Sequence, residues 1–125
     1  MAPLLLAAVG VLLLLMVGIA DAGLIIAGRF QAATAADAAA LAAAPVTFRP
    51  FGAGGTPAKE AARYAGINGA VMISCDCNKD PGWKARTVEV VVARRVELVG
   101  GGTVTVRARS TAEFDPIALL GLVDQ

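Results

Sequence analysis

Residues 2–44, APLLLAAVGVLLLLMVGIADAGLIIAGRFQAATAADAAALAAA, decide the fold. The first part, Ala2 to Gly28, carries one charged side chain, Asp21, and exceeds the roughly 20 apolar residues that a helix needs to cross a bilayer core. The second part, Arg29 to Ala44, is dominated by alanine and lacks glycine and proline, a composition that strongly favours helix. We therefore predict one continuous helix through both parts.

Pro45 is the predicted stop of this helix, because proline lacks a backbone donor and clashes with the preceding turn. A helix from Pro3 to Ala44 would be roughly 60 Å long at about 1.5 Å per residue. That length is about twice the thickness of a bilayer core. We expect a helical segment over residues 1–44, with residues 2–28 spanning the membrane before any assembly and the remainder projecting from it.

The projecting half of the helix has two unlike faces. One face has almost no side chain, since small residues recur every four positions: Gly28, Ala32, Ala36, Ala40 and Ala44. The other carries the bulk: Phe30, Thr34, Asp37 and Leu41. Small residues at this spacing let backbones approach closely, so the strip could pack against identical helices. It could equally lie on the chain's own small domain, and the sequence leaves both interpretations open.

Asp21 is the unusual residue of the apolar part. An unpaired charge in a bilayer core costs on the order of 3 kcal/mol on insertion scales, so such a residue is a functional candidate. Its partner could be Arg29 or the N-terminal amine of a neighbouring subunit; alternatively, Asp21 lies near the membrane surface and reaches water. The candidate residues for helix packing between subunits are Asp21, Gly18, Ala22, Gly28, Arg29, Ala32, Ala36, Asp37 and Ala40.

A cleavable secretory signal is the alternative to a membrane helix for this segment. Residues 20–22, Ala-Asp-Ala, fit a small-x-small cleavage site. However, a basic segment before the apolar run is lacking, and residues 23–28 remain apolar after the site. Arg29 is the basic residue nearest to the apolar run, and basic residues flanking a membrane helix tend to stay on the cytoplasmic side (the positive-inside rule). This rule would place the C-terminal end of the helix inside the cell. A basic leader preceding Met1 and later removed would resolve that conflict.

Residues 45–57 are rich in glycine and proline and are expected to form a loop. Thr56 can cap a short helix over residues 58–68, with Pro57 in its first turn, and Asn68-Gly69 can end it. Together with the strands that follow, this helix predicts a small globular domain over residues 58–125. The expected fold class is α+β: a long N-terminal helix, a short helix and a small antiparallel sheet.

Strands are expected where apolar and polar residues alternate. Residues 70–75 form a short first strand, and residues 76–82 a polar turn. A long hairpin with one apolar face follows, and its turn is expected at Gly100-Gly101-Gly102. The apolar residues of both strands can share one face only if the loop contains an odd number of residues, and we favour three. Arg94 interrupts the apolar face and needs a polar partner or an edge position. Residues 117–123 are apolar and could form a strand, a helical turn or a contact between subunits.

Composition excludes several classes of function. The net charge is +1, without a basic cluster, so nucleic acid is not an expected partner. The sequence has no histidine, which rules out histidine-based catalysis and ligation, and no serine or threonine has a base partner. We therefore expect no enzyme activity and no cofactor.

Two local motifs remain. Asp76, Asn78 and Asp80 have the oxygen spacing that opens a calcium loop, but Pro81 replaces the required glycine. They are a weak calcium candidate, with a polar turn the favoured interpretation. The other motif is Cys75 and Cys77: outside the cell we expect them to be oxidised, in a small ring or between subunits.

Three stretches carry a family resemblance: residues 19–23 (IADAG) leading into Arg29, residues 35–42 (AADAAALA) and residues 61–69 (AARYAGING). With the valine-rich strands that follow, the chain resembles TadE/TadG-like proteins of the tight-adherence (Flp) pilus system, distant relatives of type IV pilins. The resemblance implies a prepilin-like helix, removal of a basic leader and export to a surface filament. Leu5 stands where pilins usually carry a glutamate, a departure from the pattern.

The expected function is that of a structural subunit of a type IV pilus-like surface filament. Its partners would be copies of itself, other pilins and the assembly machinery, and its location the inner membrane and then the cell surface. The alternative is a membrane-anchored periplasmic minor pilin or assembly factor. We expect Asp21→Leu to harm assembly in the first case and to be nearly neutral or stabilising in the second.

Overall fold

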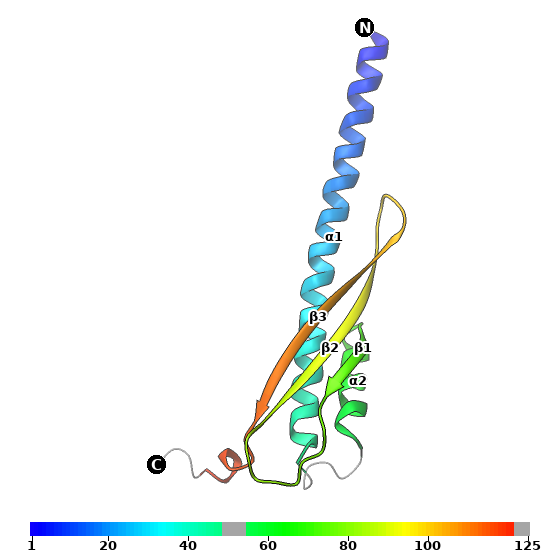
Figure 1. The fold of residues 1–125 in the computed structure, drawn as a ribbon. Coiled ribbons are helices and arrows are strands. Elements are labelled where there is room, and N and C mark those ends of the chain that lie inside the picture. The colour runs from blue at the N-terminus through cyan, green and yellow to red at the C-terminus, as the bar shows by residue number, and fades with distance from the viewer. Residues whose placement is uncertain (49–54, 122–125) are drawn as a thin grey trace.

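A computed structural model describes residues 1–48 and 55–121. The chain begins with one long helix, α1 (Ala2–Val46), and continues through α2 (Pro57–Ile67) and three strands, β1 (Val71–Asp76), β2 (Arg86–Glu97) and β3 (Thr103–Phe114). The predicted α+β class is confirmed. Figure 1 shows α2 beside the C-terminal half of α1, and the β2–β3 hairpin running along α1 with its loop toward the N-terminal half of the helix.

Helix α1 ends two residues later than predicted. It includes Pro45 and stops at Val46, where the Thr47 amide donates to Ala44 O (3.3 Å) and the Phe48 amide to Pro45 O (3.1 Å). Proline costs a helix most in its interior, where it removes a bond and crowds the preceding turn. Here it occupies the last turn, so it ends the helix shortly after itself and not before.

Helix α2 has the capping residues that its sequence predicts, and it begins and ends one residue earlier than the predicted range of 58–68. The Thr56 hydroxyl accepts a hydrogen bond from the Lys59 amide (3.1 Å), and Pro57 occupies the first turn. At the other end Asn68 is the cap, and Gly69 adopts a left-handed conformation with φ of 76°. A residue with a side chain would be strained there, so glycine suits this stop.

The sheet is antiparallel with strand order β1-β2-β3. Val88 pairs with Ala112 and Val96 with Val104, which is the predicted parity. Residues 98–102 connect the two strands. Within this connection the Leu98 amide donates to Gly102 O (3.1 Å), so the hydrogen bond encloses three residues, 99–101, which is the loop length that the sequence favours. Positive φ angles at Gly101 and Gly102 make the turn possible.

The core lies between α1 and the sheet. Helix α1 packs on α2, β2 and β3. Val88, Val90 and Val92 of β2 are almost completely buried against alanines of α1. Burial of a valine side chain contributes about 1.5–3 kcal/mol, so these three anchor the sheet.

Arg94 lies on the core face of β2 and has the polar partner that the sequence requires. Its Nη1 donates to the carbonyl oxygen of Gly69 (2.6 Å). A Cβ at Gly69 would collide with the same guanidinium. Glycine at position 69 therefore has two roles: it adopts the left-handed conformation that ends α2, and its lack of a side chain leaves room for the guanidinium of Arg94.

The C-terminal apolar segment forms a short 3₁₀ turn, Ala118–Leu120, one of the alternatives that the sequence left open. Ile117, Leu119 and Leu120 remain exposed. The predicted segment extends to residue 123, and its last two residues lie outside the described part of the chain.

Candidate functional site

Most of the N-terminal half of α1 stands free of the domain. Within the described residues, α1 is the one helix whose length and apolar composition would allow it to cross a membrane, and none of its most apolar window is buried. Leu4, Leu12 and Ile19 are mostly exposed. An exposed apolar helix of this length suggests membrane anchoring.

The strip of small residues packs on the chain's own domain. Gly28, Ala32, Ala36, Ala40 and Ala44 are all buried within the single chain. Of the two interpretations left open, the structure has the strip covered by α2 and the sheet. Gly28, Ala32, Ala36 and Ala40 are among the residues predicted to pack between subunits; within the single chain, valines of β2 and β3 and alanines of α2 occupy the space beside them.

Gly28 marks the closest approach of α1 to the hairpin. A Cβ at this position would collide with Val96 Cγ2 and lie 3.7 Å from Val106 Cγ2. Valine is stiff about χ1, so Val96 cannot easily move aside. The sheet can therefore lie on α1 here because residue 28 has no side chain.

We expect Gly28→Ala to lower the free energy of unfolding by about 1–2 kcal/mol, since overpacking outweighs the better helix propensity of alanine. Gly23→Ala is the matched control in the same helix, because no atom lies within 4 Å of its added Cβ. It should be neutral or slightly stabilising. Thermal unfolding of the full chain in detergent, followed by circular dichroism, measures both; equal melting temperatures would contradict the close packing at Gly28.

Asp21 has a partner that the sequence did not predict. Its Oδ1 accepts a hydrogen bond from the Val99 amide (2.6 Å), and its Oδ2 accepts one from the Gly100 amide (3.2 Å). Within the chain, the carboxylate is therefore held at the hairpin tip; the partners considered from the sequence, Arg29 or the N-terminal amine of a neighbouring subunit, would belong to another chain. Two charge-assisted bonds to main-chain donors satisfy the carboxylate within its own chain.

The structure places the other predicted packing residues in different surroundings. Gly18, Ala22 and Arg29 are exposed on α1. Asp37, also exposed, accepts a hydrogen bond from the Ser110 hydroxyl of β3, so it helps to hold the sheet on the helix. Gly18, Ala22 and Arg29 thus remain available for contacts outside the chain.

The bulky face of α1 points away from the domain. Phe30 is 72% exposed, Leu41 67% and Ile26 56%. These three residues, which we call the outer face, follow helical spacing on the side opposite the buried alanines. Phe30 and Leu41 were not among the contact candidates predicted from the sequence. The available signal was their position on the helix face opposite the strip of small residues.

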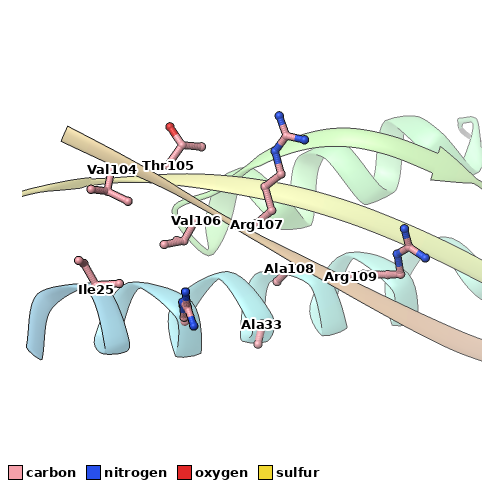
Figure 2. Close-up of a pocket in the computed structure, with 9 residues that line it drawn as sticks. Ile25, Ala33, Val104, Thr105, Val106, Arg107, Ala108 and Arg109 are labelled. Atoms are coloured by element: carbon pink, nitrogen blue, oxygen red, sulfur yellow. The ribbon is translucent and has the colours of Figure 1, made fainter. Parts of the chain in front are cut away.

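A groove of about 590 Å³ runs along the free edge of β3 and is lined on the helix side by Ile25, Arg29 and Ala33. In Figure 2, Arg107 and Arg109 of β3 point away from α1. Arg109 Nε lies 3.6 Å from Glu89 Oε1, an exposed ion pair that contributes little. The groove is open and lined by positive charge, without an acid and base placed for catalysis among its described residues.

The two local motifs of the sequence lie away from α1's exposed surface. Cys75 and Cys77 form a disulfide within the chain, with their Cα atoms 5.3 Å apart. Asp80 Oδ1 accepts a hydrogen bond from the Gly82 amide (2.8 Å), and Asp80 Oδ2 lies 4.0 Å from Arg86 Nη1. These contacts are typical of a polar turn. Among the described residues no group of three or more histidine, cysteine or acidic side chains could hold a metal ion.

Arg63 on α2 has a raised pKa. The hydrogen bond to Glu60 raises the pKa of Arg63, with the charge of Glu60 acting in the same direction. Arginine is cationic at any physiological pH, so this shift changes no charge state. The pair lies on α2, away from the exposed surface of α1.

Comparison with known families bears on α1. Residues 1–46 match the family model described as Tad: Putative Flp pilus-assembly TadE/G-like. The predicted resemblance is therefore confirmed over the N-terminal helix, and the match supports involvement in a pilus system. Neither the curated proteins nor the solved structures gave a match.

Proposed function

We propose that this chain is a structural subunit of a Tad/Flp-type, type IV pilus-like surface filament, which assembles through its hydrophobic N-terminal helix. The match of residues 1–46 to the pilus-assembly family carries this proposal. Before assembly the helix anchors the chain in the inner membrane. Afterwards the same helix packs among copies of itself and other pilins. The role is structural, without catalysis.

The surface of α1 supports assembly through the helix. Nearly all the apolar residues before Asp21 are exposed, and the outer face continues the apolar surface to Leu41. Exposing apolar surface to water costs a free energy of about 25 cal/mol for each Å². A chain that leaves the bilayer must therefore bury it against other helices.

A second candidate is a membrane-anchored minor pilin or assembly factor that never becomes a bulk component of a filament. One observation favours it: the strip from Gly28 to Ala44, the part of the projecting helix best suited to close helix packing, is covered by the chain's own domain. The outer face would then contact a single partner and not a continuous array.

Intact mass spectrometry of filaments sheared from the cell surface tests the proposal. We expect this chain to dominate the sheared fraction, because a filament consists mainly of its structural subunit. A trace amount would indicate a minor pilin. Confinement of the chain to the membrane fraction would reject the filament proposal in favour of the anchored factor.

A further inference from the structure

We propose that the tip of the β2–β3 hairpin, residues 98–102, rests on the surface of the lipid bilayer beside the point where α1 leaves it. The domain would then stand directly on the membrane and not hang from it on a free stretch of helix. This proposal rests on the anchoring half of the proposed function and is independent of filament formation.

Asp21 fixes the level of the hairpin tip along α1. Its carboxylate accepts hydrogen bonds from the Val99 and Gly100 amides, at 2.6 and 3.2 Å. The backbone at Gly100 also touches the helix one turn earlier, since a Cβ there would lie 3.1 Å from Val17 Cγ1. The tip therefore lies beside residues 17–21, as the approach of the hairpin to the upper half of α1 in Figure 1 illustrates.

The charge of Asp21 and the burial of Gly28 mark where α1 leaves the membrane. Residues 2–20 form a continuous apolar stretch of about 28 Å at 1.5 Å per residue, which is enough to cross the roughly 30 Å of a bilayer core. Asp21 then lies at the edge of the hydrocarbon, where a charge is tolerated. Gly28 is buried against Val96 and so cannot contact lipid, which favours a span ending near Ala20 over the predicted span of residues 2–28.

The chemistry of the tip suits the interface. Residues 98–102 are Leu-Val-Gly-Gly-Gly, without a charge, and the Val99 side chain is 65% exposed. At the opposite end of the sheet, the loop between β1 and β2 contains Asp80 and Lys84, and Arg86 begins β2. An apolar turn at the membrane end and a charged one at the far end match the expected polarity of an upright domain.

Arg29 adds a contact of the kind that lipid phosphates accept. It is exposed two turns beyond Asp21 and makes no ion pair with any described residue. Helix side chains lean in general toward the N-terminus, which is the membrane end of α1. Arginine binds phosphate groups through its fork of donors.

Depth-dependent fluorescence quenching tests the proposal on the full chain in phosphatidylcholine vesicles. Three single variants, Val99→Cys, Thr111→Cys and Leu12→Cys, carry an environment-sensitive dye; wild-type protein checks that the Cys75–Cys77 disulfide excludes the dye. Brominated lipids should quench the dye at residues 99 and 12 several-fold more strongly than at residue 111. Adding Asp21→Ala to Val99→Cys should reduce the quenching, because the tip loses its acceptor.

The control positions separate the two ideas. Quenching at residue 12 but not at residue 99 overturns the hairpin contact and leaves the membrane anchor intact. Absence of quenching at residue 12 overturns the anchor and the hairpin contact together. Equal quenching at residues 99 and 111 also rejects the proposal, because the sheet would then lie flat on the bilayer.

Discussion

Ala36→Leu should lower the free energy of unfolding by about 3 kcal/mol, at the upper end of the range for overpacking a core. Ala36 is completely buried in α1, and its neighbours along the strip, Ala32 and Ala40, are buried as completely. Three added carbon atoms would have to push α1 away from α2 or the sheet. Urea unfolding of the full chain in detergent measures the effect through Trp83, whose ring contacts that of Phe48 at a centroid distance of 4.9 Å.

Ala33→Leu is the matched control. Ala33 lies on the same helix but is exposed, so the same chemical change should alter stability by less than about 0.5 kcal/mol. If the two variants were equally stable, the strip would not be packed on its own domain. Its small residues would then again be available for contacts between subunits.

The sequence predicts the elements well because each has a local cause. The Thr56 cap, the glycine stop at Gly69 and the strict alternation of the hairpin each act over a few residues. Even the need of Arg94 for a polar partner follows from its place on an apolar face. The structure supplies the partner, Gly69 O, which no periodicity could name.

The candidate site was harder to predict because it depends on which surfaces meet. A strip of alanines fits a neighbouring helix and the chain's own sheet equally well, since small residues specify close approach and not identity. The partner of Asp21 was missed for a different reason. Its donors are main-chain amides of Val99 and Gly100, 78 and 79 residues away in the sequence, and every turn offers such groups.

The contact of Asp21 with the hairpin changes the use of Asp21→Leu as a test of assembly. The variant would remove a contact within the monomer, so a defect in assembly would follow from a displaced hairpin as readily as from a lost subunit contact. A sharper test needs a residue that is bulky, exposed and remote from the domain. Phe30 meets these conditions because its side chain is 72% exposed on the outer face.

Phe30→Glu should reduce the amount of filament sheared from the cell surface by well over tenfold. If α1 packs among its copies, the new carboxylate would be buried without a partner, which costs about 3–5 kcal/mol for each subunit. Every 1.4 kcal/mol is about a tenfold loss of affinity, and the cost repeats at each addition. The monomer should unfold as the wild type does, because Phe30 makes little contact with its own domain.

Gln31→Glu is the matched control for the added charge. Gln31 is exposed and lies next to Phe30 but a quarter-turn around the helix, off the outer face. This variant should yield filaments in nearly wild-type amount. If Phe30→Glu does so as well, the outer face is not buried in a filament. The anchored-factor alternative then explains best why the small strip of α1 is already occupied by the chain's own domain.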